Sequence, residues 1–184
     1  MKTKISLLLM LAIGVLFSIY SCKKKEEVDP SKTMGKVGNY WDASISGYSG
    51  TTIVIDENNG GNVAATLTFN GGTYEVEGKV TSNGIYDYVY SNGDKSKPFT
   101  LVKFDAKVGD RWEFNVGNLT VVREVVKKST EDDTPYGFMY VKTVDVEEII
   151  PEGLILKSTS SQVSKILWRF NHKFGFISAT ITKR

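Results

Sequence analysis

The chain has 184 residues, of which 41% are apolar and 24% are charged. This length and composition indicate one globular domain of ordinary size and exclude a collagen-like or wholly disordered chain. Lysine and arginine number 23 against 21 aspartate and glutamate, and Lys2 and Lys4 lie in the N-terminal segment. The rest of the chain therefore carries no basic excess, which argues against nucleic acid as a partner.

The N-terminal segment has the parts of an export signal. Lys2 and Lys4 precede an uncharged run over residues 5–20, and Ser21 and Cys22 follow that run. The run is shorter than the roughly 20 residues that a membrane-spanning helix needs. We therefore expect residues 1–21 to be a signal peptide that is removed.

The four residues Ile19, Tyr20, Ser21 and Cys22 resemble the lipobox of bacterial lipoproteins. In that family the cysteine thiol receives a diacylglycerol, and the signal peptidase then cuts before the cysteine. Tyr20 is larger than the residue usual at its position, but Cys22 is the only cysteine of the chain. The resemblance implies that the protein is held in a membrane through lipid on Cys22. The alternative is a free cysteine, which is unusual in an exported protein.

Residues 22–36 are predicted to be a charged tether, because five lysines and three acidic residues stand there without an apolar period. Lys23 after the cysteine resembles the sorting signal of outer-membrane lipoproteins in Gram-negative bacteria. The charged block 23–27 resembles the tags that place some of these lipoproteins on the cell surface. The alternative for this block is a linker that only separates the domain from the bilayer.

Residues 37–184 are predicted to form a single all-β domain, because short runs of alternating apolar and polar residues are separated by turn residues at regular intervals. We expect about ten antiparallel strands in a meander, with little helix. An open sheet of this size leaves two exposed edges, so we expect a curved half-barrel, a barrel or a sandwich. The candidate strands are 39–48, 51–56, 63–70, 73–80, 85–90, 98–104, 111–116, 119–127, 136–149, 154–158, 165–171 and 176–182.

Two segments, 107–114 (KVGDRWEF) and 170–181 (FNHKFGFISATI), resemble a pattern found in uncharacterised lipid-anchored all-β proteins. In that pattern an aliphatic-Gly-Asp-x-Trp turn precedes a closing strand that contains aromatic-Gly-aromatic. Such proteins commonly look like curved half-barrels related in shape to bacterial lipoprotein carriers. The resemblance implies a curved sheet rather than a flat one.

Catalytic motifs are scarce. His172 is the only histidine, which excludes a zinc site with several histidines, and neither a Gly-x-Ser-x-Gly turn nor a phosphate-binding Gly-Lys-Ser/Thr loop occurs. We therefore predict no metal, no cofactor and no enzymatic activity. Asp145 and Glu147 are the enzymatic alternative: they share a face of one predicted strand at about 7 Å, which would suit a carbohydrate hydrolase. A polar outer face explains them equally well.

Aromatic side chains are the candidate ligand-binding residues. Such rings stack on sugars or line apolar pockets, but they also build the cores of β-sheets, and we favour packing in the core or at its rim. Three tyrosines alternate onto one predicted face, and three tryptophans add broad rings. The candidates are Tyr86, Tyr88, Tyr90, Trp41, Trp112 and Trp168.

The sequence thus predicts a non-enzymatic, lipid-anchored outer-membrane protein, exposed on the cell surface, whose β domain binds a ligand or a partner. The partner classes that fit are a glycan, a lipid or another envelope protein. A carbohydrate-active hydrolase is one alternative. A structural accessory subunit of an envelope complex is the other.

Overall fold

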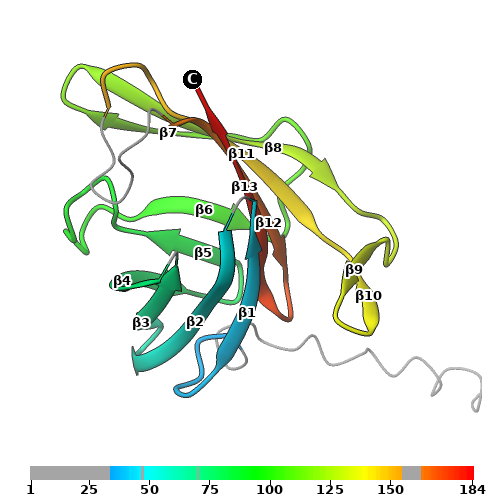
Figure 1. Ribbon diagram of the computed structural model, residues 1–184. Coiled ribbons are helices and arrows are strands. Elements are labelled where there is room, and N and C mark those ends of the chain that lie inside the picture. Colours follow the sequence, from blue (N-terminus) through cyan, green and yellow to red (C-terminus); the bar gives the residue numbers. More distant parts are fainter. Residues whose placement is uncertain (1–33, 47, 70, 155–162) are drawn as a thin grey trace, which may run out of the picture.

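The computed structural model describes residues 34–46, 48–69, 71–154 and 163–184 (Figure 1). The predicted signal peptide, Cys22 and the predicted tether up to residue 33 lie outside the described residues, as does most of the candidate strand 154–158. The described residues form strands and turns without a helix, which confirms the all-β class. Among them, no helix has the length and apolar character needed to span a bilayer.

Thirteen strands are formed by the described residues. Eleven of them make one sheet in the order β6-β5-β4-β3-β2-β1-β13-β12-β11-β8-β7, and β9 and β10 form a separate hairpin. In strands such as β7, exposed residues alternate with partly buried ones, so that one face of the strand turns to the core and the other to solvent. The strands are β1 (Tyr40–Ile45), β2 (Tyr48–Asn59), β3 (Asn62–Phe69), β4 (Gly72–Val80), β5 (Gly84–Asp87), β6 (Phe99–Lys103), β7 (Arg111–Val116), β8 (Leu119–Lys128), β9 (Thr134–Tyr136), β10 (Met139–Val141), β11 (Val144–Ile149), β12 (Val163–Asn171) and β13 (Gly175–Lys183).

The predicted meander is present in one half of the sheet, where β1 to β6 follow one another as antiparallel neighbours. In the other half β7, β8, β11, β12 and β13 do the same, with the β9–β10 hairpin inserted between β8 and β11. The expectation of purely antiparallel pairing is wrong at one place, because β1 pairs with β13 in parallel. These two strands meet in the middle of the sheet without a hairpin between them. No turn therefore dictates their relative direction.

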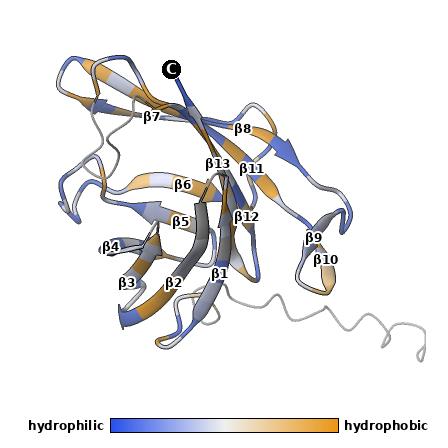
Figure 2. Ribbon diagram, in the orientation of Figure 1, coloured by the Kyte–Doolittle hydropathy of each residue, from blue (hydrophilic) through white to orange (hydrophobic). Residues whose placement is uncertain are grey.

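The sheet curls until its two halves pack face to face (Figure 1). One core cluster joins Ile45 of β1 and Val102 of β6 to Val125 of β8 and Val146 of β11. The strands at the two ends of the sheet order, β6 and β7, do not pair with each other, so the sheet does not close into a barrel and the fold is sandwich-like. Figure 2 shows apolar residues along the strands and mostly hydrophilic residues in the loops between them.

Turns shorten one of the predicted strands and divide another. The candidate strand 85–90 stops at Asp87, which leaves Tyr88 and Tyr90 in the following turn. The candidate strand 136–149 is three strands, because the chain reverses at Gly137, whose φ of +60° is easily reached only by glycine. The aromatic residues on both sides of Gly137 gave this turn the appearance of a strand.

The first described residues belong to the folded domain. Met34, which the sequence assigns to the tether, is completely buried and packs in a second core cluster with Ile55 and Val63. The backbone amide of Gly38 donates to the carbonyl of Ile55 at 2.8 Å. The folded domain therefore begins before residue 37 and includes Met34.

Candidate functional site

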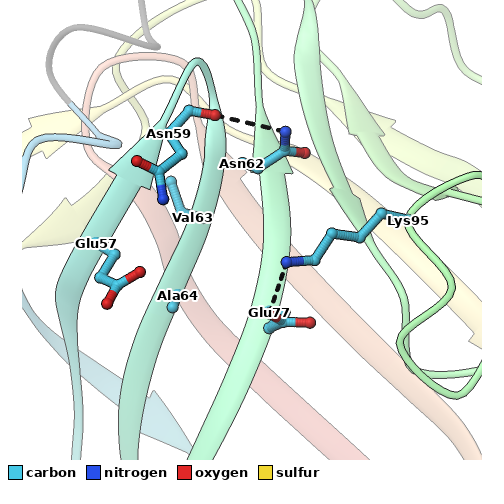
Figure 3. A pocket seen from close by; sticks show the side chains of 7 residues that line it. All are labelled: Glu57, Asn59, Asn62, Val63, Ala64, Glu77 and Lys95. Atoms are coloured by element: carbon cyan, nitrogen blue, oxygen red, sulfur yellow. Dashed lines mark hydrogen bonds and ion pairs between the residues drawn. The ribbon is translucent and has the colours of Figure 1, made fainter.

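A polar recess lies where β2, β3 and β4 face the loop that follows β5 (Figure 3). Its volume is about 140 Å³. This is smaller than the roughly 300–1,000 Å³ of a typical small-molecule pocket, so the recess can take one small chemical group. The lining residues are two carboxylates, two amides, one lysine and two small apolar residues: Glu57, Glu77, Asn59, Asn62, Lys95, Val63 and Ala64.

The register of three strands brings the two carboxylates to one face. Ala64 on β3 pairs with Glu57 on β2 and with Glu77 on β4, so the three residues lie side by side across the sheet. Directly paired residues point to the same face, and two strand spacings separate the two glutamate backbones by about 9.5 Å. The small Ala64 side chain between them leaves the space of the recess.

The loop after β5 supplies the fourth side. Lys95 reaches from this loop to Glu77, with 2.8 Å between Nζ and Oε1 (Figure 3). The hydrogen bond to Glu77 raises the pKa of Lys95, and the charge of Glu57 acts in the same direction. Ser91 Oγ donates to the carbonyls of Tyr88 and Asp94 at 3.1 Å each, which ties the loop together.

Tyr88, one of the predicted aromatic candidates, supports the recess without lining it. Its side chain is buried, and its hydroxyl donates to Oδ1 of Asn62 at 3.0 Å. Desolvation by burial raises the pKa of this phenol. The bond orients the Asn62 amide so that its NH₂ group is turned toward the β2–β3 turn.

A second cluster of charged residues is sealed inside the sandwich around Arg123 on β8, whose side chain is 2% exposed. Its Nε lies 2.7 Å from Oε2 of Glu148, and its Nη1 lies 2.6 Å from Oδ2 of Asp87. Nη1 also donates to the carbonyl of Thr100 at 3.1 Å. The guanidinium carbon is 4.1 Å from the ring centre of Phe99, a cation–π arrangement.

Glu148 accepts three donors from different strands or loops. Besides Arg123, the indole Nε1 of Trp168 donates to Oε2 at 2.9 Å, and the hydroxyl of Tyr90 donates to Oε1. Burial, followed by the charge of Glu148, raises the pKa of Tyr90, so this phenol stays protonated. The carboxylate of Glu148 is thus compensated on both oxygens.

Burial and neighbouring charges also shift the pKa values of Asp87 and Arg123. Burial raises the pKa of Asp87, and the nearby Arg123 opposes this only in part. Burial alone would lower the pKa of Arg123, but the charges of Glu148 and Asp87 raise it above its ordinary value. The cluster joins β5 and β6 to β8 and β11 across the core, so its position suits a structural clamp between the two halves of the sandwich.

The predicted aromatic candidates do not share one surface. Tyr88 and Tyr90 donate to different partners on opposite sides of the fold, Asn62 and Glu148. The single tyrosine face that the sequence predicted is therefore wrong, because the strand ends before these two residues. Tyr86 is half-buried on β5.

The tryptophans pack against the core. Trp41 and Trp112 are half-buried against core clusters, and Trp168 stacks edge-on to Phe176 with 5.8 Å between ring centres. The sequence analysis favoured packing over ligand binding for the aromatic candidates, and the three tryptophans do pack against the core. The recess is lined by other residues.

The acidic pair that the sequence offered for hydrolysis is already engaged. Asp145 is buried and accepts two hydrogen bonds from Arg169, at 2.9 and 2.6 Å. Glu147 is 3.0 Å from Lys165 Nζ. Each carboxylate is therefore neutralised by its own neighbour on β12, and the two do not converge on a cleft. His172 is exposed in the turn between β12 and β13.

The sequence analysis missed the buried cluster, although the alternation of side chains contains a signal for it. Arg123 shares a strand face with Val121 and Val125, and all three are buried. Glu148 shares a face with Val146 and is buried as well. A charged residue on an apolar face predicts a buried ion pair, because an isolated buried charge is too costly.

No group of three or more His, Cys, Asp or Glu side chains able to hold a metal ion occurs among the described residues. Comparison of the chain with protein-family models, with curated proteins and with solved structures finds no match.

Proposed function

We propose that this protein is a non-enzymatic outer-membrane lipoprotein, anchored through Cys22 and exposed on the cell surface, whose β domain binds one small polar group in the recess. A single unit of a surface glycan fits best. The observation that carries the proposal is the grouping of carboxylate, amide and ammonium side chains around a space of about 140 Å³.

The chemistry of the lining favours a polyhydroxylated ligand. Hydroxyl groups both donate and accept hydrogen bonds, and the recess offers acceptors on Glu57 and Glu77 and donors on Asn62 and Lys95. The volume is too small for an acyl chain or for haem. Lys95 is paired with Glu77, so the site is only partly acidic.

The carboxylate pair also keeps hydrolysis as a second candidate. Glu57 and Glu77 stand on either side of Ala64, and backbones about 9.5 Å apart allow the two carboxyl groups to flank a bound sugar, as they do in inverting glycosidases. A catalytic acid must be able to give up a proton, whereas Glu77 already accepts from Lys95. This pairing favours binding over catalysis.

A thermal-shift screen of the purified protein against mono- and oligosaccharides tests the proposal. Ligand at a hundredfold excess over its Kd stabilises the folded state by about 2.7 kcal/mol, which should raise the Tm by about 5–10 °C. Glu77→Gln should abolish the shift, whereas Glu75→Gln, on the same strand but outside the recess, should retain it. A hit that is also cleaved would favour the hydrolase. No shift with any sugar would contradict glycan binding.

A further inference from the structure

The β9–β10 hairpin ends in an exposed apolar tip. Phe138 is 97% exposed, Tyr140 is 64% exposed and Met139 is 36% exposed, and the three are consecutive at the turn after Gly137. The hairpin pairs with no other strand among the described residues, and it extends away from the main sheet (Figure 1). Large apolar side chains at this degree of exposure indicate a contact that the isolated domain does not satisfy.

The base of the hairpin is firmly held, so the tip has a fixed position. The hydroxyl groups of Ser129 and Thr134 each lie within 3.3 Å of the hydroxyl of Thr143. Val141 is buried, and the ring of Tyr136 lies 5.2 Å from that of Phe174. Burial, followed by the charge of Asp42, raises the pKa of Tyr136.

The hairpin and the first described residue lie against the same turn. Phe174, which contacts Tyr136, is followed by Gly175, and a side chain at Gly175 would meet Met34 Sδ at 2.9 Å. Met34 is twelve positions after Cys22, and even a fully extended chain of that length reaches at most about 40 Å. A lipid on Cys22 would therefore hold this end of the domain within about 40 Å of the membrane surface.

Exposed charges of both signs surround the hairpin, with the acidic residues 131–133 directly before β9 and lysines beside the contact with Phe174. Lys142, which follows β10, and Lys173, which precedes Phe174, are both exposed. Lys173 Nζ lies 5.2 Å from the ring centre of Phe174. Asp42 is the acidic side chain whose charge acts on Tyr136. Aromatic rings flanked by lysines are the side chains that settle at the headgroup level of a membrane.

We propose that Phe138, Met139 and Tyr140 insert into the headgroup region of the bilayer that holds the lipid on Cys22, and so dock the domain in one orientation. This inference rests on the proposed lipid anchor. A convex tip of three residues is shaped for insertion between lipids, whereas a protein partner normally needs a broader face of roughly 800 Å² on each side.

The test uses the full lipidated chain in vesicles of phosphatidylethanolamine and phosphatidylglycerol. Tryptophan is introduced by Phe138→Trp at the tip or, as a matched control, by Val89→Trp, an exposed apolar position (59%) in the loop after β5. Figure 1 shows that loop on the opposite side of the molecule from the hairpin. Emission is compared in vesicles with and without brominated acyl chains, after subtraction of the signal of the unsubstituted protein.

We expect the tryptophan at position 138 to lose emission in brominated vesicles and the one at position 89 to keep it. If the protein floats with the vesicles but position 138 is not quenched, the docking proposal alone is wrong, and a protein partner becomes the occupant of the tip. Equal quenching at both positions also overturns it. If the unsubstituted protein does not float, the lipid anchor itself fails, and the docking proposal fails with it.

Discussion

Arg123 on β8 links the two halves of the sandwich, because it pairs with Asp87 on β5 and with Glu148 on β11. It is completely surrounded, yet its charge is compensated by Glu148 and Asp87, and it contacts strands on both sides of the core. Two carboxylates face one guanidinium, so the cluster carries an excess of negative charge when all three groups are ionised. Burial of such a cluster is tolerated only while each member keeps its partners.

Truncation of the Arg123 side chain should therefore strongly destabilise the folded state. We expect Arg123→Ala to lower the free energy of unfolding by about 3–5 kcal/mol, because two buried carboxylates would lose their counter-charge. Arg111→Ala is the matched control, since Arg111 pairs with Glu113 at the exposed surface and its loss should cost less than about 1 kcal/mol. Urea unfolding measures both. Equal costs for the two variants would show that the buried cluster is not a clamp.

Asp87 should impose an unusual pH dependence on stability. Its pKa is raised in the folded state by burial, above the ordinary 3.8, so the folded state binds a proton more tightly than the unfolded state. Its contribution to the free energy of unfolding is therefore full below about pH 4 and falls as pH rises through the folded pKa. The stability of the wild type relative to Asp87→Asn should decrease from pH 4 to pH 7.

Asp133 offers a control of opposite sign for this measurement. The hydrogen bond from Ser129 lowers its pKa, so the contribution of Asp133 should be lost only as pH falls below about 4. Urea unfolding at several pH values distinguishes Asp87→Asn from Asp133→Asn. A constant difference between the wild type and Asp87→Asn over pH 4 to 7 would contradict the expected proton linkage.

At the scale of elements, a hairpin could be predicted from the sequence where its turn has a local sequence signal. Hairpins such as β3–β4 and β7–β8 were predicted close to their observed bounds, because Gly-Asn turn chemistry is local. The β9–β10 hairpin was missed, because Gly137 stands alone among aromatic residues that are themselves strand formers. A single glycine in such a run marks either a bulge or a turn, and only the tertiary contacts decide which.

Gly175 shows how one turn organises three elements. It begins β13 with a φ of +77°, and Met34 and Trp41 pack directly over it. A Cβ atom here would lie 2.9 Å from Met34 Sδ and 3.2 Å from Trp41 Cζ2. The absence of a side chain at this position therefore permits both the turn and the burial of the first described residue.

Gly71 makes a matched comparison possible, since its φ of +75° is nearly the same but nothing lies within 4 Å of its potential Cβ. Gly71→Ala should cost about 1–2 kcal/mol through backbone strain alone. Gly175→Ala should cost about 1–3 kcal/mol more, because Met34 and Trp41 must shift. Denaturant unfolding of the two variants gives the difference. If the two variants lose the same free energy of unfolding, Met34 and Trp41 can move away from a side chain at position 175 without destabilising the core.

At the scale of the whole molecule, the fold class and a curved sheet followed from alternation, turn spacing and the need to cover the sheet edges, but the strand order and the recess did not. Both depend on pairing between strands, and the recess exists because Glu57, Ala64 and Glu77 align across three of them. Neither the parallel pairing of β1 with β13 nor the approach of Asp87 to Arg123 has a local signal, since more than thirty residues separate the partners. The Tyr and Trp candidates were visible from sequence because residue type alone suggested them.

Membrane attachment belongs to the whole chain and is tested separately from the fold. If Cys22 carries lipid, Cys22→Ala should move the protein from the membrane fraction to the soluble fraction, because the lipid supplies about 0.8 kcal/mol per buried CH₂ and the tip of the β9–β10 hairpin offers just three apolar side chains in its place. The control replaces residues 23–27 with neutral residues and leaves Cys22 intact, which should preserve membrane association. Fractionation and flotation measure the distribution of both variants. Retention of Cys22→Ala in the membrane, with the domain still folded, would show that something other than this cysteine holds the protein there.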